Sequence, residues 1–534
     1  MSAFIRRTVT VRLKPDTTVP RSEIDSRTMV ASASLIAWTL LAAAQPIDAD
    51  IRAVAALAGE PRIVSAAGLL EDDTPVLTLE NSDAFDTSST RRRAVIFAGA
   101  SSPAASAAVI RMVRWFKTSA PRQLRDRWMV SALPAAGFGA GGEKSLTRWM
   151  TFQAPDVAIE IVDGATRPIG PGGVDTFSWV IRLPARDDAL GGTLRAAKPG
   201  RSAVHEMLAM RIRREPLAIA RLLAARYPET PGISYIPALA WAQTLRVAAI
   251  TGDDLREKVR RQTRPWVAGE QKLFGDRVQL TAVAGTLIFA ELAAAGDAAA
   301  MPLLDQGAAL AAAEKSPAVP EYGQGWTDDM FMATAVLARS GARPGHEHDL
   351  DVAERLLTEY AARLQQPDGL FNHATNGPAA WGRGNGFAAL GLMETLTRMP
   401  ATHPARAQLL EIYRRQMAGV KAQQAPDGMW RQIIDEPGAY REETATAMLM
   451  SAMARGVRLG WLDPSYRVPI GRAWRGLAAH VAADGTLVDV CTGTGAGPTR
   501  RYYFDRPAIT GADDRGCAMA LLAAVEMYEL LGKR

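Results

Sequence analysis

The stretch LQQPDGLFNH (364–373) recurs with changes as QQAPDGMWRQ (423–432) and, more loosely, as AADGTLVDV (482–490). Successive copies are 59 and 57 residues apart, as measured between Asp368, Asp427 and Asp484. A repeat of this length accommodates two helices and their loops. Because a two-helix unit cannot bury its apolar face alone, such units are expected to pack side by side. Closed into a ring, they form an (α/α) toroid with the Asp-Gly loops at one end. An open solenoid is the structural alternative.

The sequence from about residue 235 onward favours helices throughout. Its apolar residues recur with helical spacing, and the segments often end at Gly or Pro. We expect helices at 236–251, 278–295, 301–314, 326–340, 349–366, 382–398, 404–424, 441–459, 466–481 and 513–531. No strands are expected in this part, so the pattern predicts an all-α domain over 235–534.

Residues 50–230 have a different pattern, in which short β-rich runs alternate with helix-like segments. The expected strands are RAVIFAGA (93–100), RWMVSALP (127–134), DVAIEIVDG (156–164) and FSWVIRLP (177–184). This alternation predicts an α/β domain with a largely parallel sheet. The order of elements faintly resembles the core of zinc carboxypeptidase-like proteins. The first histidine of the chain is His205, however, so we expect no zinc ligands here and assign the domain no catalytic role.

Composition excludes several classes of protein. The chain has 534 residues, 48% of them apolar, and 22% are charged. Two cysteines, Cys491 and Cys517, are too few for a disulfide scaffold or a structural zinc site. The net charge of +6 comes without a Lys/Arg stripe interleaved with aromatic residues, so no nucleic-acid partner is expected. His346 and His348 are interpreted as loop residues, with metal binding as the minor alternative, and no metal or organic cofactor is predicted.

The N-terminus combines a basic segment with a short apolar one. Residues 1–28 are polar and basic, and the apolar run Leu35–Ala44 is too short to span a membrane. Small residues directly before Gln45 fit a signal-peptidase site. We therefore expect residues 1–44 to be removed on export, which gives a periplasmic or secreted protein. A buried amphipathic helix is the alternative. No later segment has eighteen consecutive apolar residues, so no stable membrane insertion is expected.

The segment GQGWTDDMFMATAVLAR (323–339) is expected to begin a helix. Asp328 and Asp329 then lie in or near its first turn, where carboxylates interact favourably with the helix dipole. Simple capping would explain them. Trp326 and the apolar residues 330–332 flank the pair, however, and a carboxylate among apolar groups has a raised pKa and can donate a proton.

The segment AWGRGNGF (380–387) begins the helix that follows the first Asp-Gly loop. Its three glycines are costly in a helix and indicate close backbone approach or a ligand. Trp381 offers a flat apolar face to a sugar ring, and Arg383 offers two parallel donors to a carboxylate. A core tryptophan and a surface arginine are the alternative interpretation.

Together, GWTDDMFMA, FNH, WGRGNGF and the late DRPAITGADDRGCAMALLA (505–523) resemble the unsaturated glucuronyl/rhamnogalacturonyl hydrolases of glycoside hydrolase families 88 and 105. The resemblance covers about 240–534 and implies an (α/α)6 barrel that needs no cofactor. It also implies the substrate, an unsaturated oligosaccharide derived from pectin or a glycosaminoglycan by a polysaccharide lyase. Such enzymes hydrate the C4=C5 double bond of the terminal unsaturated uronic acid. One aspartate protonates C4 and assists water onto C5, and the hemiketal opens to release the sugar.

The resemblance also implies the roles of individual residues. Asp328 matches the catalytic acid/base, and Asp329 is the alternative. The expected substrate contacts are Trp326, His373, Trp381, Arg383, Asn385, Phe387 and Trp430. Phe387 stands where many members have tryptophan, so stacking can persist but a hydrogen bond from an indole N–H cannot.

One departure from the family pattern keeps other functions open. Members carry a second aspartate on an early helix, whereas this chain has Leu280, Thr281 and Ala282 in the corresponding place. A catalytically degenerate carbohydrate-binding barrel is therefore one alternative. A conventional inverting glycosidase that pairs Asp328 with Glu442 or Glu443 is another, although both glutamates also fit ordinary charges at a helix N-terminus.

Overall fold

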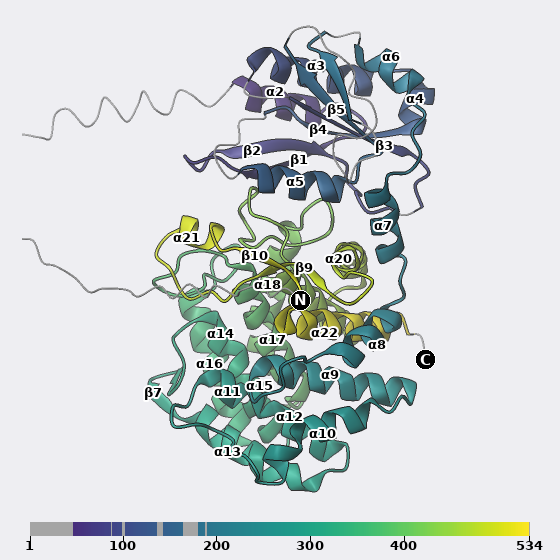
Figure 1. Ribbon diagram of the computed structural model, residues 1–534. Coiled ribbons are helices and arrows are strands. Elements are labelled where there is room, and N and C mark those ends of the chain that lie inside the picture. Colours follow the sequence, from purple (N-terminus) through teal and green to yellow (C-terminus); the bar gives the residue numbers. More distant parts are fainter. Residues whose placement is uncertain are drawn as a thin grey trace, which may run out of the picture. The chain divides into compact units, whose positions relative to one another are not determined.

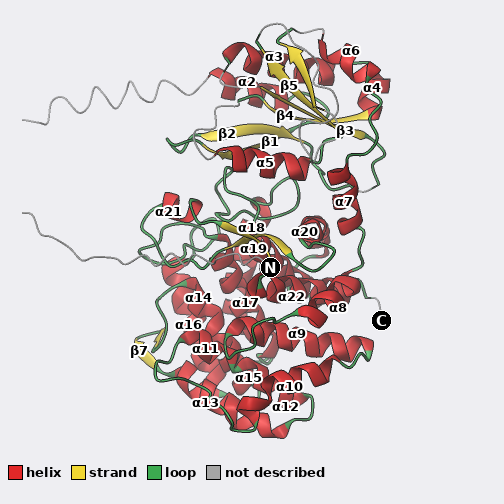
Figure 2. Ribbon diagram, viewed as in Figure 1, coloured by secondary structure: helices red, strands yellow, loops and turns green. Residues whose placement is uncertain are grey.

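The computed structural model describes residues 46–86, 88–98, 102–135, 142–163, 180–186 and 189–532. The predicted leader, residues 1–44, and its cleavage point before Gln45 lie outside these ranges. Residues Ala49–Arg534 form one compact unit. Within this unit the six-stranded sheet precedes a mostly helical part (Figure 2). The division into domains at about residues 230–235 remains a prediction.

The sheet has the order β1-β2-β4-β3-β5-β6. Its strands are β1 (Ile63–Leu69), β2 (Pro75–Glu80), β3 (Arg92–Ala98), β4 (Trp128–Leu133), β5 (Val157–Val162) and β6 (Val180–Pro184). The last four strands, β3 to β6, run parallel to one another, as the alternating pattern predicted. β1 pairs antiparallel with β2, and β2 with β4. These two strands were not among the predicted ones.

Helices connect the parallel strands and cover the sheet. They are α2 (Pro46–Ala55), α3 (Pro103–Thr118), α4 (Arg122–Arg127), α5 (Gly142–Gln153), α6 (Ala189–Ala196) and α7 (Ala203–Ile212). The chain passes from β3 through α3 to β4 on one side, and from β4 through α5 to β5 on the other side of β3. Right-handed crossovers in opposite directions place α3 and α5 on opposite faces of the sheet (Figure 1).

The helical part contains a helix in every predicted range. Its helices are α8 (Pro216–Arg226), α9 (Tyr235–Thr251), α10 (Leu255–Val267), α11 (Leu280–Gly285), α12 (Leu287–Ala294), α13 (Met301–Ala312), α14 (Thr327–Met332), α15 (Thr334–Gly341), α16 (His348–Leu364), α17 (Gly382–Arg398), α18 (Arg406–Ala422), α19 (Glu443–Arg458), α20 (Arg467–His480), α21 (Arg500–Phe504) and α22 (Asp514–Leu530), with short 3₁₀ turns at Ala298–Ala300 and Pro464–Tyr466. The sequence did not predict α10, because nearly half of its residues are charged and it contains Pro265.

Short strands also occur in the helical part, which corrects the expectation of none. They are β7 (Glu314–Ser316), β8 (Val319–Pro320), β9 (Leu487–Cys491) and β10 (Ala508–Gly511). β9 pairs antiparallel with β10, and β7 with β8. These strands are too short to show a clear alternation of apolar and polar residues, so the sequence predicted only the helices around them.

The helix contacts follow a closed path. α9 contacts α11, α11 contacts α14, α14 contacts α17, α17 contacts α19, α19 contacts α22, and α22 returns to α9. A second set packs outside them: α10 and α8 on α9, α13 on α12 and α15, α16 on α15, α18 on α17, and α20 on α19. Inner and outer helices together enclose one continuous apolar core.

The three Asp-Gly loops have the same local structure. The side chain of each aspartate accepts a hydrogen bond from the backbone N–H two residues later. The following glycine is left-handed in every copy, with φ of 90° at Gly369, 88° at Gly428 and 83° at Gly485. Each loop follows an outer helix and precedes an inner one. The three loops therefore lie at the end where the inner helices begin.

No helix in the described ranges is both long and apolar enough to cross a membrane.

Candidate active site

The first turn of α14 places two adjacent carboxylates in different surroundings. The backbone N–H of Thr327 donates to the carbonyl of His373 at 2.9 Å, which ties the start of α14 to the loop after Asp368. The side chain of Asp329 is buried, with 3% of the residue exposed. The Asp328 side chain retains 16% exposure. Only Asp328 is therefore within reach of solvent or a substrate.

Asp329 holds the turn before α14. Its Oδ2 accepts from the backbone N–H groups of Gln324 at 2.8 Å and Gly325 at 2.7 Å, and from the Tyr360 hydroxyl at 2.6 Å. Burial raises the pKa of Asp329 to about 6, although these hydrogen bonds act in the opposite direction. These contacts are those of a residue that holds the backbone before α14 in place.

Asp328 is joined to a histidine and a tyrosine. Its Oδ2 lies 3.0 Å from Nε2 of His373, and Nδ1 of His373 lies 2.9 Å from the hydroxyl of Tyr503. The Tyr503 hydroxyl also accepts from the backbone N–H of Gly497 at 3.1 Å. An ionised carboxylate can only accept, so Nε2 of the neutral His373 imidazole carries the proton and donates it to Asp328. Nδ1 is then the acceptor for the proton of the Tyr503 hydroxyl.

This arrangement leaves one oxygen of Asp328 available. Within the described ranges, no residue forms a hydrogen bond with Oδ1 of Asp328. The histidine fixes Oδ2 and the orientation of the carboxyl group. A proton held on Oδ1 can therefore be given to a molecule bound at this position.

Aromatic rings surround His373. The ring centroid of Trp381 lies 4.5 Å from that of His373, with Trp326 at 5.4 Å and Tyr503 at 5.5 Å. The indole Nε1 of Trp381 and the hydroxyl of Thr327 are buried without a hydrogen-bond partner among the described residues. Buried polar atoms normally have partners, so these two are available to a ligand or a bound water.

Arg383 lies beside Trp381 and is 2% exposed. Its terminal nitrogens donate to the carbonyls of Cys491 and Thr492, both at 2.6 Å, and its guanidinium lies 4.8 Å from the centroid of the Trp381 ring. Both of the nitrogens expected to hold a carboxylate thus already hold the loop after β9. The guanidinium supplies positive charge beside Trp381 and keeps further N–H protons for a ligand.

Two glycines of the WGRGNG segment are required by close packing. A Cβ on Gly382 would lie 2.5 Å from the carbonyl oxygen of Arg431, and one on Gly384 would lie 2.6 Å from the hydroxyl of Thr327. Neighbouring inner elements therefore approach α17 too closely for a side chain. Of the two explanations predicted for these glycines, the structure shows close approach within the protein.

Three of the predicted substrate contacts lie elsewhere. The Asn385 amide exchanges hydrogen bonds with the backbone of Phe371, both at 2.8 Å, and so holds the loop that carries His373. Phe387 is 1% exposed in the helical core and stacks on Phe331 with centroids 6.0 Å apart. Trp430 is fully buried, and its indole donates to the carbonyl of Val420 at 2.7 Å. The structure does not bring these side chains to Asp328.

The two glutamates at the start of α19 also differ. Glu442 caps the helix: its carboxylate accepts from the backbone N–H groups of Thr444 at 3.1 Å, Ala445 at 2.6 Å and Cys491 at 2.8 Å. Glu443 is fully buried, and neither of its oxygens has a hydrogen-bond partner among the described residues. Burial, reinforced by the neighbouring Glu442, raises the pKa of Glu443 well above its usual value.

The first turn of α11 carries no carboxylate. It begins at Leu280, followed by Thr281, whose hydroxyl faces only Gln279 at 3.5 Å. The structure thus places no carboxylate in this turn, in agreement with the sequence. Across the described part of the chain, no group of three or more His, Cys, Asp or Glu side chains is arranged to hold a metal ion.

Comparison with known proteins identifies the family. Residues 238–531, more than half of the chain, match the model of Glycosyl Hydrolase Family 88. The chain belongs to this family. The matched region of this family 88 chain runs from α9 to α22 and contains Asp328, His373 and Arg383.

Two curated relatives show what the family 88 chain is similar to. It is 28% identical to the unsaturated rhamnogalacturonyl hydrolase YesR of Bacillus subtilis (strain 168) over 212 residues. These aligned residues cover 38% of this chain and 60% of the relative. It is 26% identical over 175 residues to an unsaturated 3S-rhamnoglycuronyl hydrolase of Alteromonas sp. (strain LOR), which is 30% of this chain and 42% of that protein. The chain thus spans less than two thirds of either relative.

Solved structures share the fold of the family 88 part. A possible family GH105 member from Salmonella enterica serovar Paratyphi A matches with a TM-score of 0.52 and 20% identity, covering 59% of this chain and 93% of that one. A family 105 glycoside hydrolase from C. acetobutylicum ATCC 824 matches with a TM-score of 0.51 and 19% identity, covering 59% and 99%.

The sequence did not predict the contribution of α21, which lies between β9 and α22 in the chain. Tyr503 lies 130 residues after its partner His373. Its segment RYYF directly precedes DRPAITGADD, which was part of the family resemblance, but nothing in a single sequence pairs that tyrosine with that histidine.

Proposed function

We propose that the chain is an unsaturated uronyl hydrolase that releases the terminal unsaturated uronic acid from lyase-generated oligosaccharides by hydration of the C4=C5 double bond. Membership of family 88 and the activities named for the two curated relatives support this proposal. The observation that carries it is the fixed Asp328–His373–Tyr503 chain, which leaves Oδ1 of Asp328 available to a ligand.

In this mechanism Asp328 acts as acid and then as base. The protonated Asp328 gives its proton to C4 as a water oxygen bonds to C5, and the carboxylate takes the proton that the water loses. Water is thereby added across the double bond, and Asp328 regains its proton. The hemiketal at C5 then opens, and the aglycone sugar leaves. His373 keeps the carboxyl group oriented through its Nε2 hydrogen bond, and Tyr503 fixes the imidazole tautomer.

The surrounding residues fit an acidic sugar. Trp326 and Trp381 provide apolar ring surface beside His373. The buried Arg383 guanidinium supplies positive charge next to Trp381, where it stabilises a uronate carboxylate. The substrate is proposed to be an unsaturated oligosaccharide derived from pectin or a glycosaminoglycan.

The barrel that holds this site is proposed to be an (α/α)6 toroid. The closed path of contacts through α9, α11, α14, α17, α19 and α22 supports it, as does the outer helix packed on each inner one. In such a barrel the six inner helices begin at one end, and their N-terminal dipoles favour a bound anion there.

One alternative is supported by a specific observation, and another is not. The missing carboxylate on α11 favours a barrel that binds the sugar without turnover. A conventional inverting glycosidase would need a second free carboxylate. Glu442 is engaged with the backbone, and Glu443 is fully buried, with neither oxygen hydrogen-bonded to a described residue.

One assay separates these functions. The purified protein is incubated with unsaturated rhamnogalacturonan and chondroitin disaccharides, and the ultraviolet absorbance of the conjugated enoate is followed together with sugar release. Loss of absorbance with release of the aglycone is expected. New reducing ends without that loss would indicate a conventional glycosidase. Binding in calorimetry without either change would indicate a binding protein.

Export is a further part of the proposal. The apolar run Leu35–Ala44 followed by Gln45 supports cleavage by signal peptidase and a periplasmic or secreted mature protein. Mass spectrometry of protein purified from its native host should show an N-terminus at Gln45. An intact Met1 or Met29 at the N-terminus would contradict it.

A further inference from the structure

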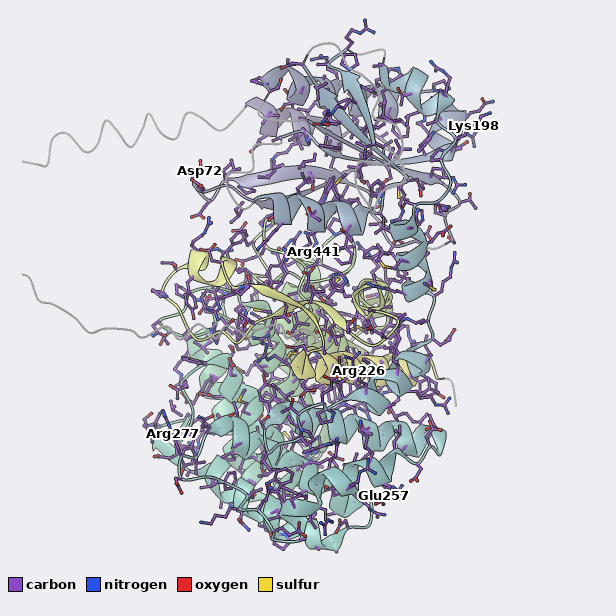
Figure 3. The ribbon with its side chains drawn as sticks, in the orientation of Figure 1. Asp72, Lys198, Arg226, Glu257, Arg277 and Arg441 are labelled. Carbon is purple, nitrogen blue, oxygen red and sulfur yellow. The ribbon has the colours of Figure 1, made fainter. Side chains whose placement is uncertain are left out.

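A cavity of about 350 Å³ lies outside the site around Asp328. One wall comes from β1 and α5, including Lys144, Arg148 and Trp149, and the opposite wall comes from loops of the helical part, including Tyr440 and Asp489. Arg441, which also lines it, is labelled in Figure 3 below α5. The volume is within the range of small-molecule pockets.

The cavity contains a strained and incompletely bonded aspartate. Asp489 has a left-handed φ of 60° and is 3% exposed. Its Oδ1 accepts from Nε of Arg148 at 2.9 Å, but its buried Oδ2 has no hydrogen-bond partner among the described residues. The nearest imidazole nitrogen, Nε2 of His480, lies 3.9 Å away. Such a conformation is rare outside glycine and concentrates at functional sites.

A second unpaired group lies beside it. The hydroxyl of Tyr440 is buried, with Cys491 beside it and without a nitrogen or oxygen partner in the described part of the chain. The Arg148 guanidinium lies 4.8 Å from the Tyr440 ring centroid and thereby links this ring to Asp489. Sugar hydroxyls form hydrogen bonds with groups such as the Asp489 carboxylate and the Tyr440 hydroxyl. The indole ring of Trp149, which lines the same cavity, offers an apolar surface to a sugar ring.

The charges of the cavity favour an acidic ligand. Its lining includes the cations Lys144, Arg148, Arg441 and Arg506 and the carboxylates Asp427, Asp489 and Asp505. Arg441 is paired with Asp427 at 2.8 Å. Lys144 and Arg506 form no ion pair with a residue that the structure describes. Two cations thus remain for a carboxylate of the ligand.

A small apolar cluster separates the cavity from Asp328. It contains Trp381 and Tyr503, which contact His373, and Ala439, which lines the cavity, with Tyr440 and Phe504 packed against it. The cavity is therefore a second site behind the wall of the first.

We propose that this cavity binds a saturated uronate unit of an oligosaccharide, with Lys144 and Arg506 holding its carboxylate. Asp489 accepts a hydrogen bond from one ring hydroxyl, and the Tyr440 hydroxyl forms a hydrogen bond with another. The choice of ligand rests on the proposed function, because its substrates carry uronate units. The cavity itself does not depend on it. The α/β region thereby takes part in holding long oligosaccharides near the barrel.

Calorimetry with saturated trigalacturonate tests the proposal, because this probe has no double bond to hydrate. Lys144→Glu reverses a charge on an exposed residue of α5 and should weaken binding about tenfold or more. Asp489→Asn replaces the unpaired acceptor Oδ2 with an amide donor while tolerating the left-handed backbone, so a ring hydroxyl loses its acceptor and binding should weaken. Lys198→Glu is the matched control, since Lys198 is exposed and outside the cavity (Figure 3); its binding should equal that of the wild type.

Turnover of an unsaturated disaccharide, measured in the same proteins, separates this proposal from the previous one. Normal disaccharide turnover with weakened trigalacturonate binding in the two cavity variants supports both. Binding that depends on Lys144 in a protein without turnover overturns the proposed function and supports the cavity site. Equal binding by all variants, no binding by the wild type, or equal binding of neutral cellotriose overturns the cavity site, whatever the turnover.

Discussion

Two inner helices begin with adjacent carboxylates, Asp328-Asp329 at α14 and Glu442-Glu443 at α19, and the two pairs have different surroundings. In each pair one member is bonded to the backbone of its own turn: Asp329 through Oδ2 and Glu442 through both oxygens. The other member differs. Asp328 is partly exposed and paired with His373, whereas Glu443 is buried without a hydrogen-bond partner in the described ranges.

The comparison shows that position in a first helical turn does not decide the role of a carboxylate. The same dipole and the same N-terminal position act on all four groups. A histidine brought by another loop makes Asp328 a candidate acid, whereas burial without a hydrogen-bond donor among the described residues raises the pKa of Glu443. Four substitutions test this difference.

Asp328→Asn should have the largest effect. Removing a general acid lowers the rate by about 10²–10⁴-fold, and because Asp328 is partly exposed, folding should change little. Enoate loss measured under saturating substrate gives kcat, and calorimetry gives affinity, which should remain near that of the wild type.

The matched control for this variant is Asp351→Asn. Asp351 also accepts from a histidine, with 3.2 Å to Nε2 of His403, but its side chain is 71% exposed on the surface. It should keep full activity. If Asp328→Asn keeps more than about a tenth of the wild-type turnover, Asp328 is not the general acid.

Glu442→Ala should reduce stability by about 3 kcal/mol or more. It leaves three buried backbone N–H groups without an acceptor, and each such group costs about 1–3 kcal/mol. The free energy of unfolding is measured by urea denaturation. Glu347→Ala is the control, since Glu347 precedes α16 without a side-chain cap bond to that helix. Equal loss in both variants would show that Glu442 does not hold the start of α19.

Asp329→Asn should remove a pH dependence of stability. The pKa of Asp329 is raised in the folded state from 3.8 to about 6, so its stabilising contribution is complete below pH 3.8 and is lost as pH rises through about 6. The neutral amide has no such loss. Relative to the wild type, the variant should gain up to about 3 kcal/mol between pH 4 and pH 7, measured by urea denaturation across that range. A constant difference between the two proteins would contradict the raised pKa.

Glu443→Gln should remove a pH dependence of stability with the same sign. The pKa of Glu443 lies well above 4.5 when folded, so the wild type loses stability as pH rises above 4.5. The variant should therefore gain stability relative to the wild type as pH rises above 4.5, measured by urea denaturation across the same pH range as for Asp329→Asn. A wild type and variant whose stabilities change in parallel with pH would contradict the raised pKa of Glu443.

The sequence by itself determined the helical part in considerable detail. The Asp-Gly copies at Asp368, Asp427 and Asp484 marked equivalent turns, because a left-handed glycine after a side-chain turn is a local requirement. Apolar spacing gave most helices of 235–534, since each helix needs one face in the core. The charged α10 carries a weak signal of this kind and was missed. The family resemblance drew attention to Asp328, His373, Trp381 and Arg383.

The tertiary structure decided the partners of these residues. Tyr503 meets His373 across 130 residues of chain, and Arg148 of α5 meets Asp489 across 341. Hydrogen bonds of this kind depend on how loops of different helices meet, which local pattern does not encode. Burial also separated Asp328 from Asp329, and placed Phe387 and Trp430 in the core, because the packing of neighbouring helices, and not the order of the chain, decides which side chains solvent can reach.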